Sequence, residues 1–191
     1  MRVTLKDVRV AYAQGLFEAR APEGGGEPKF NAAFLFPRTH EAVKILSDAI
    51  TKVATEKWAA KAGDMLKQLK AADRLPVHDG NTKPTSAGYE GNLFINAGNK
   101  IKPLVVDTNP QVVLSMADGK PYSGSYVNAI VEIWAQDNKY GKRVNAALSG
   151  VQFVRDGERL AGGSIATADD FEPIPGAAAE GQQTDPASLF A

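Results

Sequence analysis

The chain opens with two segments in which polar and apolar residues alternate. Residues 1–10 and 29–36 have the two-residue period of β-strands. The residues between them contain Gly24-Gly25-Gly26 with prolines on both sides, a composition typical of a flexible hairpin loop. This glycine run lacks the spacing of a phosphate-binding loop, so we assign no nucleotide site to it. The chain is therefore predicted to begin with two strands.

The period changes to that of a helix after residue 37. Apolar residues recur at helical spacing, at Val43, Leu46, Ile50 and Val53, and Thr39 is the predicted N-cap. A second helical stretch covers about residues 57–72, separated or kinked at Gly63. Its lysines form either a solvated face or a DNA-contacting face: Lys57, Lys61, Lys67 and Lys70. We predict a helical insertion over about residues 39–73.

Prolines and glycines in residues 73–90 predict a loop, after which strand patterns continue. The predicted strands are 92–97, 104–106, 111–114, 125–136 and 143–154. The segment from Asp137 to Lys142 is a predicted hairpin turn, because Asn and Gly tolerate positive φ. Strands, a helical insertion and further strands predict an α+β, mostly β body, most simply a five-stranded barrel.

The strand over residues 125–136 separates its side chains into two faces. Its apolar set is predicted to face the core: Val127, Ala129, Val131 and Ile133. Tyr126 and Trp134 then lie on the opposite, solvent-facing side, and Phe94 lies between two asparagines in the same way. Aromatic rings on a solvated face can stack with the bases of single-stranded nucleic acid. The alternative is that these rings pack under the helix or in a subunit interface.

Basic residues lie near these aromatics in the sequence and could follow a phosphate backbone. Two lysines come after Phe94, and three basic residues surround Tyr140 in the predicted hairpin turn, although a charged hairpin tip is also common without a ligand. We predict a DNA-binding set of Tyr126, Trp134, Phe94, Tyr140, Lys100, Lys102, Lys139, Lys142 and Arg143.

Charge is unevenly distributed along the chain. The whole sequence has 22 basic and 22 acidic residues, but residues 169–191 contain five acids and no Lys or Arg. Residues 1–168 thus carry 22 basic and 17 acidic residues, a formal charge of +5. We predict a DNA-binding domain over 1–168 and a disordered acidic C-terminal tail over 169–191 that binds partners. A segment that only aids solubility is the alternative. The tail residues concerned are Asp169, Asp170, Glu172, Glu180, Asp185 and Phe190.

The sequence gives little support to catalysis or to a cofactor. It has no cysteine, and its two histidines, His40 and His78, have no metal-ligand spacing. One further hypothesis is a two-metal nuclease site, which would use turn aspartates: Asp79, Asp107, Asp118 and Asp137. Asp is expected in turns for backbone reasons, so we predict no enzyme, no metal and no cofactor. The N-terminus has no signal-peptide pattern and no stretch is long enough to span a membrane, which favours the cytoplasm.

Three segments resemble a family of bacteriophage and prophage proteins similar to the phage T7-type single-stranded DNA-binding protein. These are residues 89–97, 122–129 and 148–158. The resemblance covers about residues 1–160. It implies an OB-fold that coats single-stranded DNA during phage replication and recombination in the host bacterial cytoplasm.

The resemblance also implies a role for the tail. An acidic tail ending in an aromatic residue would compete with DNA and contact replication proteins, such as the phage DNA polymerase or helicase-primase. Here the matching aromatic, Phe190, is penultimate. The resemblance further implies a homodimer. The leading hypothesis is a sequence-nonspecific single-stranded DNA-binding protein, and the alternative is a phage structural or assembly protein.

Overall fold

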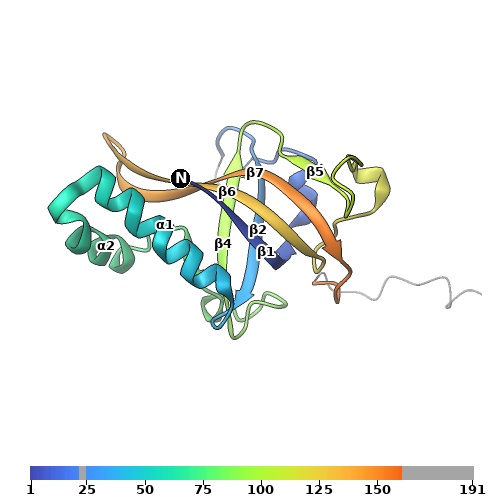
Figure 1. Ribbon diagram of the computed structural model, residues 1–191, viewed down its shortest axis with the longest axis horizontal. Coiled ribbons are helices and arrows are strands. Elements are labelled where there is room, and N and C mark those ends of the chain that lie inside the picture. Colours follow the sequence, from blue (N-terminus) through green and yellow to red (C-terminus); the bar gives the residue numbers. More distant parts are fainter. Residues whose placement is uncertain (22–24, 161–191) are drawn as a thin grey trace, which may run out of the picture.

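The computed structural model describes residues 1–21 and 25–160. Their strands form one seven-stranded sheet in the order β3-β4-β2-β1-β6-β7-β5 (Figure 1). All neighbouring pairs are antiparallel except β5 and β7, which are parallel. The strands are β1 (Arg2–Ala11), β2 (Phe30–Pro37), β3 (Val77–Asp79), β4 (Asn92–Asn99), β5 (Leu104–Val106), β6 (Tyr126–Asn138) and β7 (Gly141–Arg155).

Two differences from the predicted strands have local causes. Residues 111–114 form no strand, because only Val113 makes a bridge, to Val106. The predicted loop over residues 73–90 contains the short strand β3, whose three residues pair with β4. Three residues are too few for an alternating pattern to be visible in the sequence. The structure is therefore mostly β with helices, as predicted, but with a different set of short strands.

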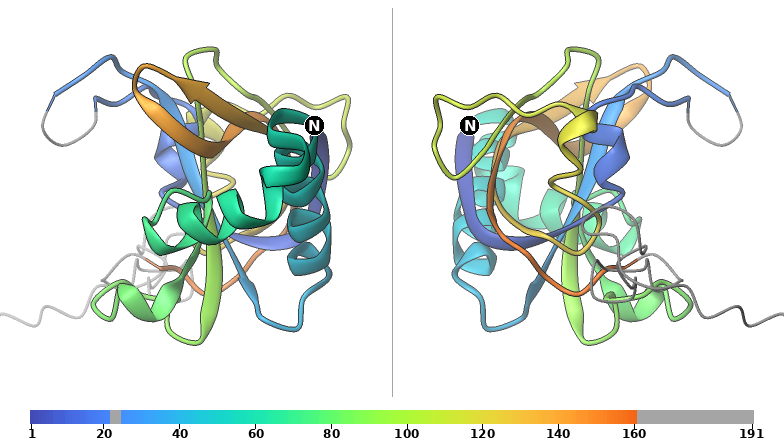
Figure 2. Two further views of the ribbon diagram at one scale, coloured as in Figure 1. Left: turned by 90° about the vertical axis from the view of Figure 1, so that its left-hand side faces the viewer. Right: turned by 90° about the vertical axis from the view of Figure 1, so that its right-hand side faces the viewer.

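The sheet curves around its own core, as both views in Figure 2 show. Two features bring β7 back toward β4. The pairing of β1 with β6 shifts register between Leu5 and Val8, where Asp7 has a positive φ of 48°. Beyond that, Asn99 at the end of β4 donates a hydrogen bond of 3.0 Å from Nδ2 to the Leu148 carbonyl of β7. Bulges of this kind bend and twist a strand, which permits the curvature.

Two helices lie between β2 and β4 in the sequence: α1 (Glu41–Trp58) and α2 (Ala62–Ala71). The N-cap of α1 is His40 and not Thr39 as predicted, because His40 Nδ1 accepts a hydrogen bond of 3.1 Å from the Ala42 backbone N–H. The helices separate at Ala59, where φ is 47°, and not at Gly63. An alanine with positive φ gives no signal in the sequence.

The main core lies between the inner face of the sheet and α1. The predicted core face of β6 is confirmed, since Val127, Ala129, Val131 and Ile133 are all fully buried. Leu46, Ile50 and Val53 of α1 pack in the same cluster, as their helical spacing predicted. A second, smaller cluster lies apart from this core and consists of Ala11, Ala33, Leu35, Tyr89 and Phe94. The sheet is thus covered on two sides along part of its length.

Candidate nucleic-acid interface

The outer face of β6 and β7 is open to solvent near their hairpin. Trp134 is 44% exposed, and its register partner on β7 is Asn145. Arg143, which pairs with Gln136, lies diagonally from Trp134 on the same face. The prediction that Trp134 lies on a solvated face is therefore confirmed. An indole, an amide and a guanidinium come together here, which provides stacking and hydrogen-bonding groups in one place.

The hairpin between β6 and β7 carries the other basic residues predicted there. Tyr140 at the tip is 74% exposed, and Lys139 Nζ lies 5.1 Å from its ring centroid. Lys142 forms an ion pair of 3.6 Å with Asp137. The turn is closed by Asn138, whose side chain accepts a hydrogen bond of 2.9 Å from the Tyr140 backbone N–H. The predicted hairpin turn is confirmed, and its cations are accessible to a ligand.

The helices fix the position of this hairpin. Trp58 at the end of α1 donates a hydrogen bond of 2.9 Å from Nε1 to the Asp137 carboxylate. After α2, the Arg74 carbonyl accepts a hydrogen bond of 3.1 Å from the Val144 backbone N–H of β7. Figure 1 shows the hairpin extending to the same end of the molecule as α1 and α2. The helical segment therefore supports the strand ends that carry Arg143 and Trp134.

Phe94 does not lie on a solvated face, so this part of the prediction is wrong. The ring is 2% exposed. Tyr89, from the loop before β4, packs edge-on against it with the ring centroids 4.9 Å apart, and His78 of β3 stacks on it at 5.2 Å. The alternation in β4 correctly placed Phe94 on the face opposite Ile95, but no local pattern indicates that a loop covers that face.

A groove runs beside Phe94 and ends near the hairpin. One hollow of about 420 Å³ includes Lys83 and Phe94, and an adjoining hollow of about 260 Å³ includes Arg143 and Asn145. We call the two together the β4 groove. The hollows share the residues Asp73, Leu75, His78 and Asn96. Lys83 Nζ lies 5.1 Å from the Phe94 ring centroid, so a cation stands at one end of the groove and a guanidinium at the other.

Lys100 and Lys102 lie in the connection between β4 and β5. Lys100 forms an ion pair with Glu27, and Lys102 is exposed. Neither lysine lines the β4 groove. Their assignment to the DNA-binding set stays a prediction.

Tyr126 is partly covered by an arginine that the sequence did not single out. The Arg155 guanidinium carbon lies 3.5 Å from the Tyr126 ring centroid, and Arg159 lies 4.0 Å from Tyr122 in the same way. Arg155 also forms an ion pair of 3.0 Å with Asp7. One available signal was that Tyr122, Tyr126 and Arg155 fall in two of the segments that resemble the phage family. We call Arg155, Tyr126, Arg159 and Tyr122 the arginine–tyrosine cluster.

The four turn aspartates serve the backbone and neighbouring cations. Hydrogen bonds from Asn81 and Arg38 lower the pKa of Asp79, and Lys120 lowers that of Asp107. The Ser115 hydroxyl and N–H lower the pKa of Asp118, while Asp137 accepts from Trp58. Within residues 1–21 and 25–160, no three His, Cys, Asp or Glu side chains gather as a metal site would require. The nuclease hypothesis therefore gains no support from the geometry.

Comparison with known proteins decides the family. A family model described as the single-stranded DNA-binding protein of Enterobacter phage Enc34 matches residues 1–185. The chain belongs to this Enc34 family. The resemblance to phage single-stranded DNA-binding proteins is thereby confirmed, and the prediction of a protein that is not an enzyme agrees with membership of a family of binding proteins.

Relatives of this Enc34-family protein support the assignment. A protein called p50 of Acyrthosiphon pisum secondary endosymbiont phage 1 is 39% identical over 177 residues, which are 91% of this chain and 94% of p50. The Enc34 protein solved in complex with single-stranded DNA is 26% identical, with a TM-score of 0.69 over 84% of this chain and 89% of that one. The protein gp2.5 of bacteriophage T7, at 15% identity and a TM-score of 0.52, covers 91% of this chain and 98% of its own and shares the fold.

The acidic tail and the absence of a membrane-spanning segment were also predicted from the sequence. The predicted tail, residues 169–191, lies outside the described residues. In the part of the chain that the structure describes, no helix is both long and apolar enough to cross a membrane.

Proposed function

We propose that this protein binds single-stranded DNA without sequence preference. The observation that carries the proposal is the exposed Trp134 beside Arg143 and Asn145, next to the end of the β4 groove. An exposed indole can stack on any base, because every base has a π-face, and each such contact contributes about 1–3 kcal/mol. The solved complex of the Enc34 relative with single-stranded DNA supports the same ligand.

The proposed path uses both stacking and charge. The strand passes over Trp134, with its phosphates near Arg143 and the hairpin lysines Lys139 and Lys142. It continues along the β4 groove toward Lys83. Each phosphate neutralised by a cation releases counterions, so binding weakens as salt concentration rises.

A fluorescence titration with oligo(dT) tests this proposal. The chain has two tryptophans, Trp58 and Trp134, and only Trp134 is exposed, since Trp58 is 9% exposed. We expect oligo(dT) to quench part of the fluorescence, and Trp134→Ala to abolish most of the quenching and weaken binding about tenfold. Trp58→Phe leaves Trp134 as the only tryptophan, so oligo(dT) should quench the fluorescence that remains; this variant assigns the signal and is not a control for affinity, because Trp58 also anchors the hairpin. Absence of quenching in the wild type, or equal affinity for duplex DNA, would contradict the proposal.

We also propose that five strands form an OB-fold barrel. The strands concerned are β4, β2, β1, β6 and β7, which are consecutive in the sheet. The hydrogen bond from Asn99 to Leu148 joins the first to the last of them and supports closure. OB-folds commonly bind oligonucleotides on one open side of such a barrel. Coating of single strands during phage DNA replication and recombination, in the host cytoplasm, is the process we propose for it.

The acidic tail is proposed to compete with DNA for the basic surface and to contact replication proteins, the phage DNA polymerase or helicase-primase. Its five acids and Phe190 would act there. The described chain ends at Leu160, whose backbone N–H donates a hydrogen bond of 2.9 Å to the Ser123 carbonyl. Arg159 precedes it directly, so the last described residue lies next to the arginine–tyrosine cluster. This position supports competition between the acidic tail and DNA for the same part of the binding face.

A homodimer, or the larger assemblies of the structural-protein alternative, would require a surface for contacts between subunits. The connection around β5 exposes apolar side chains that fit this need: Ile101, Leu104, Val112, Val113 and Met116. Light scattering without DNA distinguishes the DNA-binding proposal from the structural-protein alternative. A dimer agrees with the first, and large symmetric assemblies support the second.

A further inference from the structure

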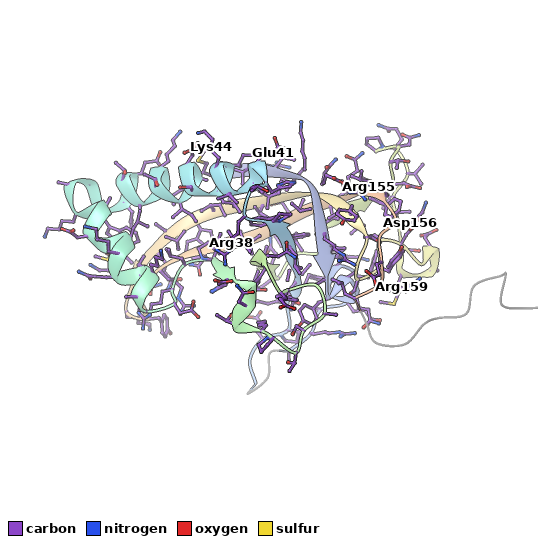
Figure 3. All side chains as sticks on the ribbon, turned by 90° about the horizontal axis from the view of Figure 1, so that it is seen from below. Arg38, Glu41, Lys44, Arg155, Asp156 and Arg159 are labelled. Carbon is purple, nitrogen blue, oxygen red and sulfur yellow. The ribbon has the colours of Figure 1, made fainter. Side chains whose placement is uncertain are left out.

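Two arginine side chains lie over tyrosine rings at the C-terminal end of β7. Arg155 covers Tyr126 at 3.5 Å and Arg159 covers Tyr122 at 4.0 Å, measured from guanidinium carbon to ring centroid. Figure 3 shows both arginines at the end of the molecule away from α1 and α2, with Arg38 lying apart from them. Separations this short mean that each guanidinium is in van der Waals contact with its ring.

The Arg155 guanidinium is held along its edge by Asp7 and on one plane by the Tyr126 ring. Its Nε and Nη2 atoms donate hydrogen bonds of 3.2 and 3.0 Å to the two carboxylate oxygens of Asp7. Asp7 occupies the position of the β1 bulge. The side chain of Arg155 is nonetheless 51% exposed. Because Tyr126 covers one plane of the guanidinium and Asp7 takes part of its edge, the opposite plane is the main surface left for a ligand.

The backbone around the cluster is built for close approach. A Cβ on Gly124 would lie 2.1 Å from the Glu158 carbonyl oxygen, and one on Gly157 would lie 2.2 Å from the Gly124 carbonyl oxygen. Tyr122 donates a hydrogen bond of 3.0 Å from its hydroxyl to the Gly157 carbonyl. These contacts bring the segment that carries the tyrosines against the segment that carries the arginines. The stacked arrangement is therefore fixed by the fold.

We infer that Arg155, with Arg159 beside it, stacks on unpaired nucleobases and extends the binding face beyond Trp134. This inference rests on the proposed binding of single-stranded DNA. A guanidinium is planar and weakly hydrated, and it stacks on bases as aromatic rings do. A base contact is favoured over a phosphate contact because Asp7 already engages two donors of Arg155 and partly neutralises its charge.

The position of the cluster suits a continuous strand. Tyr126 and Trp134 lie on the same face of β6, eight residues apart, which corresponds to about 26 Å at the rise of a β-strand. A single strand of several nucleotides fits this length, within the roughly 4–16 nucleotides that an OB-fold covers. Bases would thus meet aromatic Trp134 at one end and the plane of Arg155 at the other.

Arg155→Lys tests the inference, because lysine keeps the charge and can still pair with Asp7 but has no plane. We expect this variant to bind oligo(dT) about tenfold more weakly than the wild type. Affinity for an abasic strand of the same length should not change, and neither should the dependence of affinity on salt. Arg38→Lys is the matched control: Arg38 is also 51% exposed and ion-paired, with Asp79 at 2.6 Å, and none of the aromatic rings among the described residues stacks with it.

Two results would overturn the inference while leaving the proposed function intact. One is oligo(dT) binding by Arg155→Lys equal to that of the wild type. The other is an equal loss toward the abasic strand, which would show a phosphate contact. Failure of the wild type itself to bind oligo(dT) would instead remove the proposed function. If circular dichroism shows that Arg155→Lys is misfolded, Arg159→Lys replaces it. We expect this variant to lose affinity for oligo(dT) and to keep its affinity for the abasic strand.

Discussion

Phe94 and Trp134 show how differently two aromatic residues in equivalent sequence contexts are used. Both are predicted to project from the outer face of the sheet, between polar neighbours. Trp134 is 44% exposed beside Arg143, whereas Phe94 is closed off by Tyr89 and His78. A single-stranded DNA ligand can reach the first ring and not the second. For these two residues, exposure therefore separates a proposed binding role from a structural one.

Phe94→Ala is expected to reduce the free energy of unfolding by about 3–5 kcal/mol, because truncating a buried phenylalanine leaves a cavity. Trp134→Ala is the matched control and should change it by no more than about 0.5 kcal/mol, as is usual for exposed sites. Urea denaturation followed by circular dichroism measures both. Equal stability of the two variants would show that the small cluster around Phe94 contributes little to folding.

The β6–β7 hairpin depends on the helical segment for its position. The link from Trp58 to Asp137 and the link from Arg74 to Val144 join two parts of the chain that are about 70–80 residues apart in sequence. A hairpin anchored at its base loses less conformational entropy when it binds a ligand. At the scale of the element, α1 and α2 thus serve the proposed binding face without providing its contact residues.

Trp58→Phe removes the indole N–H and leaves Asp137 without this donor. We expect a loss of about 1.5–3 kcal/mol in the free energy of unfolding, the usual range for a hydrogen bond to a charged group. Trypsin should also cleave the hairpin at Lys139 or Lys142 faster than in the wild type. Asp137→Asn is the comparison, since its amide oxygen can still accept the hydrogen bond and protection should be largely kept. Unchanged cleavage in Trp58→Phe would mean that the link from Arg74 to Val144 is enough to hold the hairpin.

The connection between β5 and β6 is held by carboxylates, which makes it sensitive to acid. Lys120 lowers the pKa of Asp107 and Ser115 lowers that of Asp118, both from an ordinary value of 3.8. Because each folded-state pKa lies below the unfolded-state value, the stabilisation is fully present above about pH 4 and is lost as pH falls through the folded-state pKa. We expect Asp118→Asn to lose less stability than the wild type between about pH 5 and pH 3 in urea titrations. Identical pH profiles would contradict this assignment.

Charge and topology act together over the whole molecule. Residues 1–168 carry a formal charge of +5, and residues 169–191 carry five acids. The described chain ends at Leu160, next to Arg159 and close to the other groups of the arginine–tyrosine cluster. The proposed competition between tail and DNA follows from this arrangement, because both would approach the same cations.

Deletion of residues 169–191 is expected to tighten binding of oligo(dT) at low salt by about tenfold and to have less effect at high salt, where both interactions are screened. Replacing the five tail acids with their amides, Asp by Asn and Glu by Gln, is the charge-only control and should reproduce the effect. Fluorescence titrations at two salt concentrations measure it. Unchanged affinity at low salt would remove the competition mechanism and spare the proposed DNA binding.

Several features could be predicted from the sequence: the alternation of the long strands, the buried face of β6, the amphipathic α1, the hairpin turn and the family. These depend on local periodicity and on neighbouring residues, which the sequence displays directly. The folded chain was needed to show that Tyr89 covers Phe94, that Trp58 donates to Asp137, and that Arg155 lies on Tyr126. Each of these pairs joins different elements or loops, and their contacts depend on how the sheet curves and which loop crosses it. An alternating pattern assigns a side chain to a face, but what covers that face is set by the fold.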